Sequence, residues 1–168
     1  TYYYRVRAYN TVGTSGNSNS IEVTTAAAAP VAAQPDTVTQ TSFTPAWYHS
    51  SGAMGYYLDV STAWDFSYDL ILNNQDVGSD TSYYVSGLTS GTLYYYRVRA
   101  YCSLGTSYNS GTISVYTLPD APVASDASPV YETYFQANWN SVSGASGYMI
   151  DVSLYSDFSS FVNWYQDY

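Results

Sequence analysis

The chain carries little charge, and one sign dominates. Lysine is absent, arginine supplies all 4 basic residues, and 13 acidic residues leave a net charge of −9 over 168 residues. Such a surface repels the phosphates of nucleic acids and the headgroups of anionic lipids. Because only 10% of the residues are charged, serine, threonine, asparagine and tyrosine must supply most of the polar surface. This composition argues against nucleic-acid partners and is typical of secreted or cell-surface proteins.

Cysteine and histidine, which often act in catalysis, are scarce. Cys102 is the only cysteine, which excludes an intrachain disulfide, and His49 is the only histidine. Nothing in the sequence places these two side chains together, as a nucleophile and its base would have to be. No apolar run reaches the roughly 18 residues that a membrane span needs. We therefore expect no enzyme activity, no cofactor, no metal and no membrane insertion.

Helical periodicity is missing as well, and strict alternation takes its place. In residues 94–101 one face carries Tyr94, Tyr96, Val98 and Ala100, and the other carries Tyr95, Arg97, Arg99 and Tyr101. A period of two residues is typical of a half-buried strand. Clusters of glycine, serine, asparagine and aspartate separate several such runs, which indicates an antiparallel β-sandwich.

The most informative feature is an internal repeat. The segment YYYRVRAY occurs at residues 2–9 and again at 94–101, an offset of 92 residues. The same offset relates several other pairs of residues: Pro30 and Pro122, Phe43 and Phe135, Trp47 and Trp139, Gly55 and Gly147, Tyr56 and Tyr148, Asp65 and Asp157, Phe66 and Phe158. A period of this length suits a whole small domain rather than a solenoid repeat. His49 and Cys102 are not repeated, because Ser141 and Asn10 stand at the equivalent positions.

These residues resemble tandem fibronectin type III domains over all 168 residues. Pro30 matches the entry to strand A, Trp47 the core tryptophan of strand B and Tyr56 the start of strand C. Leu88, Gly91 and Tyr94 match the corner that precedes strand F. The resemblance implies an all-β fold: a seven-stranded immunoglobulin-like antiparallel sandwich repeated in tandem. It places strands A, B and E in one sheet and C′, C, F and G in the other.

The repeat divides the chain into three parts under this resemblance. Residues 1–25 correspond to the C-terminal part of one repeat, with strands F and G. Residues 29–118 form a complete repeat, and residues 119–168 supply the N-terminal part of the next, with strands A, B, C and C′. The segments GYYLDVS, DFS and YYYRVRAY resemble repeats of large secreted or surface proteins of Bacteroidota-type bacteria.

Alternation predicts which side chains of the complete repeat are buried. The expected core consists of Trp47, Tyr56, Leu58, Val60, Leu88, Tyr94, Tyr96, Val98, Ile113 and Val115. A second set is expected on the outer face of the C–F–G sheet: Tyr57, Asp59, Tyr95, Arg97, Arg99, Tyr101 and Tyr116. One interpretation is structural, with Arg97 and Arg99 pairing across strands with Asp59 as an exposed ion pair. The other is a flat interaction face for another chain or a glycan, since tyrosine and arginine are favoured at interfaces.

Two further patterns are weaker. The segment Asp76–Asp80 supplies carboxylates but lacks the spacing of a calcium loop, so a solvated turn is the expected structure. The triplet beginning at Asp36 resembles a short O-glycosylation acceptor of Bacteroidota, with Thr37 as the modified residue. The second copy does not reproduce it.

We therefore expect a structural or interaction module in a tandem array, part of an extracellular or cell-surface filament, stalk or adhesin. The expected partners are neighbouring repeats and other copies of the same chain, with a glycan as a further possibility. The alternative is a spacer or carbohydrate-binding accessory module of a secreted hydrolase.

Overall fold

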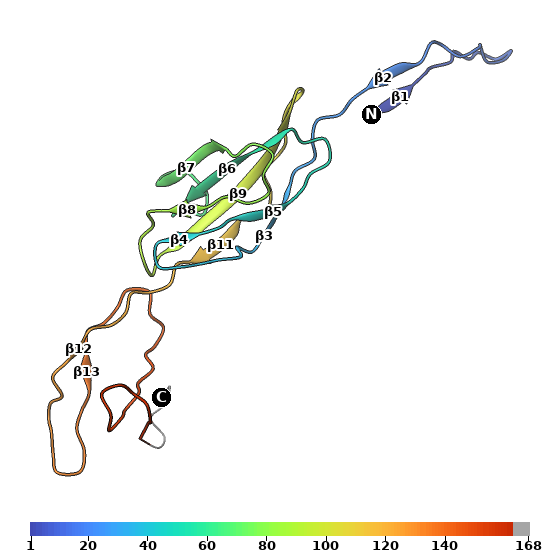
Figure 1. Cartoon of the computed structure of the whole chain (residues 1–168). Coiled ribbons are helices and arrows are strands. Elements are labelled where there is room, and N and C mark those ends of the chain that lie inside the picture. The colour runs from blue at the N-terminus through green and yellow to red at the C-terminus, as the bar shows by residue number, and fades with distance from the viewer. Residues whose placement is uncertain (163–168) are drawn as a thin grey trace. The chain divides into compact units, whose positions relative to one another are not determined.

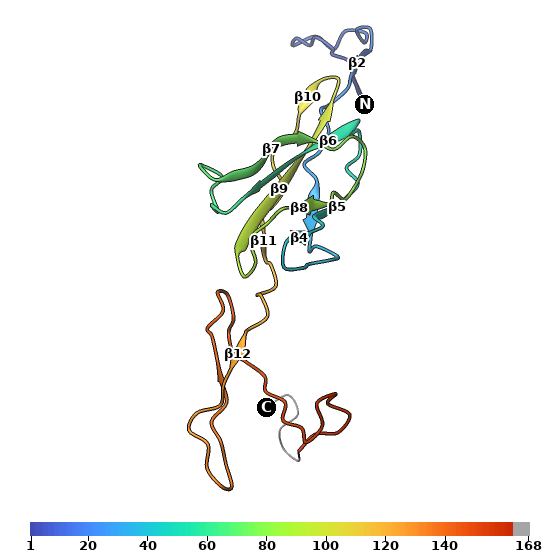
Figure 2. The ribbon, with the colours of Figure 1, turned by 60° about the vertical axis from the view of Figure 1, so that its left-hand side comes forward.

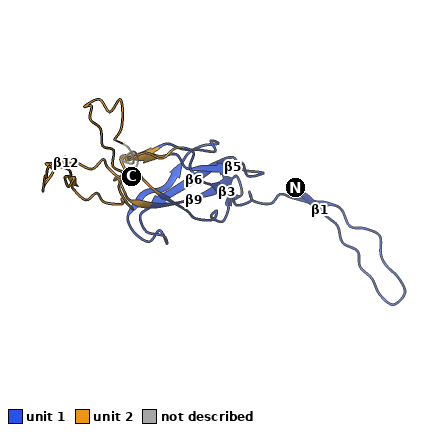
Figure 3. Cartoon of the chain, turned by 90° about the horizontal axis from the view of Figure 1, so that it is seen from below, with its two compact units in different colours: residues 1–36, 44–84, 94–115 blue, residues 37–43, 85–93, 116–168 orange. Residues whose placement is uncertain are grey.

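The computed structural model describes residues 1–162 and contains only β-strands (Figure 1). No helix occurs within this range, so none is long and apolar enough to cross a membrane. The chain divides into two compact units, residues 1–36, 44–84 and 94–115 in one and 37–43, 85–93 and 116–168 in the other (Figure 3). We call them unit 1 and unit 2.

The main sheet of unit 1 has the strand order β10 (Gly105–Thr106), β9 (Leu93–Cys102), β6 (Gly55–Ser61) and β7 (Leu70–Asp76). Strand β11 (Ile113–Tyr116) also pairs with β9. The pairs β6–β9, β6–β7 and β9–β10 are antiparallel, and every residue of β6 is paired with a residue of β9 (Figure 2). Alternation of buried and half-buried residues along β9 follows the period of two that the sequence predicts.

A second layer of unit 1 is built from β3 (Val31–Ala33) and β5 (Ala46–Tyr48). Residues 81–83 continue it, because Trp47 N donates to Thr81 O at 2.9 Å and Ala46 bridges to Ser82. The Trp47 and Tyr56 rings meet edge to face with centroids 5.7 Å apart, and the Tyr96 hydroxyl donates to the Ala33 carbonyl. These contacts join the two layers into a sandwich. One sheet has the order A–B–E, formed by β3, β5 and residues 81–83. The other has the order C′–C–F–G, formed by β7, β6, β9 and β11. The predicted fold class is confirmed.

The predicted core is also confirmed, with one exception. Nine of the ten expected side chains are buried: Trp47, Tyr56, Leu58, Val60, Leu88, Tyr94, Tyr96, Val98 and Val115. Ile113 is only half-buried. It is the first residue of β11, which pairs with β9 alone, so one side of the residue faces solvent.

The described part of unit 2, up to residue 162, contains two separate strand pairs. Strands β4 (Ser42–Phe43) and β8 (Val85–Ser86) are antiparallel, and the turn that follows β8 is tied down by Leu88 N donating to Thr41 O at 3.0 Å. Strand β12 (Ala124–Ser125) pairs with β13 (Asn138–Trp139). Residues 147–153, which align with β6 at the 92-residue offset, belong to no strand within the described range. The predicted strand C of this part is therefore not formed there.

The N-terminal segment of unit 1 is a long hairpin, in which β1 (Tyr2–Tyr4) pairs with β2 (Ile21–Val23). We call residues 2–23 the tail hairpin. It repeats local detail of strands β9 and β11: Val6 N donates to Ser18 Oγ at 2.9 Å, as Val98 N does to Ser110 Oγ at 3.0 Å. All its residues are exposed, whereas the core residues of the complete repeat are buried.

Unit 2 repeats detail of the complete repeat in the same way. The Trp139 and Tyr148 rings are 5.6 Å apart, and Val142 N donates to the Tyr148 hydroxyl just as Ser50 N does to that of Tyr56. The boundaries at residues 25, 29, 118 and 119 stay predictions, and the part of the predicted strand C′ that reaches residues 163–168 lies outside the described residues.

Candidate interaction site

The predicted outer face lies on the paired strands β6 and β9. Their register sets Asp59 opposite Arg97, Tyr57 opposite Arg99, and Gly55 opposite Tyr101. Directly opposed side chains on one face of an antiparallel pair are about 4.5–5.5 Å apart at Cβ. The pairing of β6 with β9 therefore brings together two arginines, one carboxylate and two tyrosines, and the interaction role of this face stays a prediction.

The carboxylate of Asp59 is not part of an exposed surface, which corrects the predicted exposed ion pair. Its side chain is only 4% accessible, and Oδ2 accepts from Arg97 Nε at 3.0 Å. The other oxygen, Oδ1, accepts from the backbone N–H of Asn74 at 2.7 Å. Arg99 Nη2 lies 4.0 Å from Oδ2. Because a buried charge must be paired, these contacts make Asp59 a structural link between β9, β6 and β7.

Phe66 covers this link, and sequence reasoning missed its role. The Arg97 guanidinium carbon lies 4.1 Å from the centroid of the Phe66 ring, a cation–π contact. Phe66 stands in the turn between β6 and β7 with φ of 59°, a left-handed conformation that is uncommon for a bulky residue. Phe158 has φ of 52° at the equivalent position. The recurrence of Asp-Phe-Ser was visible in the sequence, but the position of the ring over arginine was not.

A second cluster forms at the other end of the strand pair. The Tyr57 and Tyr101 rings are 4.8 Å apart, and the Tyr101 hydroxyl donates to Asp76 Oδ1 at 3.2 Å. Partial burial and this carboxylate raise the pKa of Tyr101 above its usual value. A Cβ on Gly55 would come within 2.3 Å of the Tyr101 ring, so the ring can lie over the strand only because residue 55 is glycine.

The remaining predicted residues do not join these clusters. Tyr95 is half-buried opposite Ser61, and Tyr116, in unit 2, is exposed.

Thr37 is exposed between β3 and β4, where glycosylation stays a prediction. Asp76 Oδ1 accepts from Gly78 N at 2.9 Å in the expected turn. Within residues 1–162 no three histidine, cysteine or acidic side chains gather as metal ligands would.

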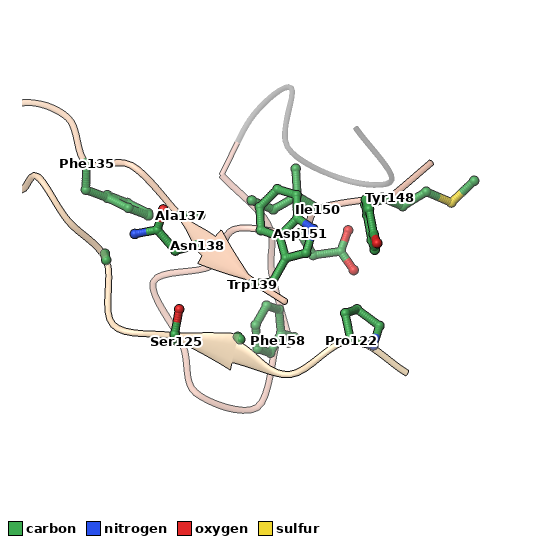
Figure 4. A pocket seen from close by; sticks show the side chains of 13 residues that line it. Pro122, Ser125, Phe135, Ala137, Asn138, Trp139, Tyr148, Ile150, Asp151 and Phe158 are labelled. Carbon is green, nitrogen blue, oxygen red and sulfur yellow. The ribbon is translucent and has the colours of Figure 1, made fainter. Parts of the chain in front are cut away.

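A hollow apolar surface in unit 2 was not predicted as a site. Its cavity of about 500 Å³ is lined by residues of 122–158, among them Phe135, Trp139, Tyr148, Ile150 and Phe158 (Figure 4). We call these five residues the head groove. The Tyr148, Ile150 and Phe158 side chains gather around Trp139, and Asp151 lies beside them. The groove is the surface that corresponds, at the 92-residue offset, to part of the buried core of the complete repeat.

The chain is similar to several solved structures. No family model and no curated protein sequence matches the chain. Among solved structures, the chicken CNTN1 FN1–FN3 domains match 68% of this chain at 21% identity, with a TM-score of 0.48. This chain spans 41% of that structure.

A human fibronectin type III domain, from fibronectin type III domain containing protein 3, matches 59% of this chain and 93% of its own length at 25% identity. Its TM-score is 0.49. Because both TM-scores lie below 0.5, the fold is defined by the strand pairing described above rather than by these similarities.

Proposed function

We propose that this chain is a structural and interaction module of a tandem array, in an extracellular filament, stalk or adhesin. The single observation that supports it best is the recurrence of tertiary detail at the repeat offset. The indole-to-tyrosine contact of Trp47 and Tyr56 recurs at Trp139 and Tyr148, and the hairpin bonds of Val98 recur at Val6. Repetition of a whole folding unit is typical of a molecule whose length and surface are its function.

The electrostatics of the complete repeat favour the same role. Asp59 is the one buried acidic residue within residues 1–162. One of its carboxylate oxygens accepts a hydrogen bond from Arg97 and the other accepts one from the Asn74 N–H. A carboxylate whose two oxygens already accept from Asn74 and Arg97, with the Arg97 guanidinium against the Phe66 ring, stabilises a sheet and is poorly placed to accept a substrate proton. We accordingly propose a non-enzymatic module whose arginines are structural.

One observation favours the alternative role of a carbohydrate-binding accessory module. The adjacent rings of Tyr57 and Tyr101 are only half-buried and lie on one sheet face. Flat tyrosine pairs offer an apolar surface and hydroxyl groups for contact with a sugar or another chain. Binding of the chain to an array of glycans, compared with binding of Tyr101→Ala, separates this role from the structural one.

Immunogold labelling of the source cells tests the main proposal. Antibodies raised against the 168-residue chain should decorate extended structures outside the cell, in regularly repeated positions. Labelling confined to the cytoplasm would contradict the proposal. Finding the labelled chain as part of a secreted hydrolase would contradict it as well.

A further inference from the structure

The connection between β6 and β7 presents two large aromatic side chains to solvent. We call residues 62–69 the β6–β7 loop; it joins the two strands at the edge of the main sheet of unit 1 (Figure 2). Trp64 is 73% and Tyr68 63% accessible, whereas Phe66 between them is buried. Tryptophan is highly buried on average in folded proteins. An exposed indole in the middle of a complete domain therefore points to contact with another molecule.

Buried anchors hold this loop in one conformation. Ser61 is fully buried, and its Oγ donates to Tyr68 O at 2.8 Å and accepts from Ala63 N at 2.9 Å. Phe66 N donates to Ala63 O at 3.1 Å, and the Phe66 ring lies against the guanidinium of Arg97. A ligand therefore meets aromatic residues whose backbone is already ordered, which lowers the entropic cost of binding.

The same scaffold recurs in unit 2 at the 92-residue offset. Ser153 Oγ donates to Ser160 O and accepts from Tyr155 N. Phe158 N donates to Tyr155 O at 3.1 Å, and Phe158 shares the positive φ of Phe66. The two copies of the loop are thus built by the same hydrogen bonds.

The side chains that the scaffold displays differ between the copies. Ser156 and Ser160 stand at the positions of Trp64 and Tyr68. The two aromatic rings are therefore not needed to fold the loop. Variable side chains on a loop that a rigid framework positions are typical of a binding site.

The exposed area favours a small ligand over a protein. An aromatic side chain buries about 150–250 Å² when it is fully covered, so the exposed fractions of Trp64 and Tyr68 offer roughly 200–350 Å² together. A specific protein interface buries about 800 Å² on each partner. The two rings suit a ligand of a few units, such as an oligosaccharide.

Charge on the loop disfavours an anionic ligand and supplies a hydrogen-bond acceptor. Asp65 and Asp69 are the only charged residues among residues 62–69. The hydroxyl and the N–H of Ser67 donate to Asp65 Oδ1 at 2.8 and 3.1 Å, and these bonds lower the pKa of Asp65. The carboxylate therefore stays ionised, and its Oδ2 is left to accept from a hydroxyl group of a ligand.

We propose that the β6–β7 loop binds a neutral oligosaccharide. The C–H faces of the sugar rings stack on Trp64 and Tyr68, and a sugar hydroxyl donates to Asp65. The site lies at the opposite end of β6 from Tyr101, which is paired with Gly55. It adds a binding role to one repeat and does not depend on the proposed array function, which stands whether or not a sugar binds.

A panel of immobilised oligosaccharides probed with the whole 168-residue chain tests this site. The panel holds neutral oligomers of glucose, mannose, galactose and N-acetylglucosamine, and anionic oligomers of uronic acids. The chain should bind at least one neutral oligomer and none of the anionic ones. Failure to bind any neutral oligomer, or a preference for the uronic acids, would overturn the proposal.

Calorimetric titration of variants with the neutral oligomer that binds locates the site. Trp64→Ser and Tyr68→Ser introduce the residues that the same scaffold carries in unit 2. Each should weaken binding by about tenfold or more, and the double variant should not bind. Tyr108→Ser, at a position that is 91% accessible, is the matched control and should bind like the unmodified chain. The main unfolding transition should be the same in all of these variants, because the substituted side chains are exposed.

Two results would show that the rings serve another purpose. Binding that Tyr101→Ala abolishes and Trp64→Ser leaves unchanged would place the sugar on the cluster of Tyr57 and Tyr101 instead. Self-association of the chain in sedimentation velocity that Trp64→Ser abolishes would make the rings a contact between copies. Either result would overturn the assignment of the β6–β7 loop to a sugar.

Discussion

Replacement of Arg97 by glutamine should destabilise the complete repeat strongly, although arginines on sheet surfaces usually contribute little. Arg97 is 27% accessible, but the Asp59 carboxylate that it holds is 4% accessible. A hydrogen bond to a charged group contributes about 1.5–3 kcal/mol, and the lost contact with Phe66 adds about 0.5–1 kcal/mol. An exposed ion pair, by contrast, contributes only about 0–1 kcal/mol.

Two contacts of Asp59 survive the substitution and limit the loss. The Asn74 N–H still donates at 2.7 Å, and Arg99 stays 4.0 Å away. The cost should therefore fall below the roughly 3–5 kcal/mol of a buried charge left without its partner. We expect about 2–3 kcal/mol, which for a domain of this size lowers Tm by roughly 10–20 °C.

Thermal and urea unfolding of the whole chain, followed by circular dichroism, measures this cost. Arg5→Gln is the matched control, because it changes the same residue within the same sequence of the tail hairpin, where the side chain is exposed. The control should move the main transition by less than about 0.5 kcal/mol. If Arg97→Gln costs no more than Arg5→Gln, the reasoning about the buried carboxylate is refuted.

Three other substitutions or conditions have definite expected outcomes. Trp47→Ala should cost about 3–5 kcal/mol in urea unfolding by leaving a cavity, whereas Trp47→Phe should cost clearly less, because the buried indole N–H has no hydrogen-bond partner within the described structure; equal costs would contradict this. Burial raises the pKa of Tyr96 to about 12, so the contribution of its neutral hydroxyl to stability is complete below pH 10 and is lost as the pH rises toward 12. The loss should be about 2–3 kcal/mol and should be smaller in Tyr96→Phe, as measured by urea unfolding at a series of alkaline pH values; identical pH profiles would show that Tyr96 is not responsible. Gly55→Val should displace the Tyr101 ring and cost about 1–3 kcal/mol, whereas the double variant with Tyr101→Ala should recover part of that cost; strictly additive costs would mean that the ring does not lie over residue 55.

The core could be predicted from the sequence because burial along each strand follows period two, whereas the strand order was implied only by the resemblance to tandem fibronectin type III domains. Alternation assigns each side chain of β9 to one face, and the second copy fixes which residues are general features of the repeat. Ile113 followed the same alternation and still came out half-buried, since alternation says which face a residue occupies but not how far the neighbouring strand extends.

The environment of Asp59 could not be predicted in the same way. Its place opposite Arg97 follows from the pairing of β6 with β9, but its burial depends on a turn without periodicity that carries Phe66 back over the sheet at positive φ. The head groove escaped prediction for a related reason. The sequence shows that Trp139 and Tyr148 are core residues of a repeat, whereas their exposure depends on which strands the described structure sets against them.

The central claim, that this chain belongs to a tandem array, is tested most directly by the mass of the native polypeptide that contains it. Antibody-captured material from the source cells can be weighed by mass spectrometry under denaturing, reducing conditions and mapped by its peptides. The account predicts a mass far above 18.5 kDa, with further peptides that repeat the YYYRVRAY pattern at the same spacing. A native chain of 18.5 kDa without such further peptides would contradict the account.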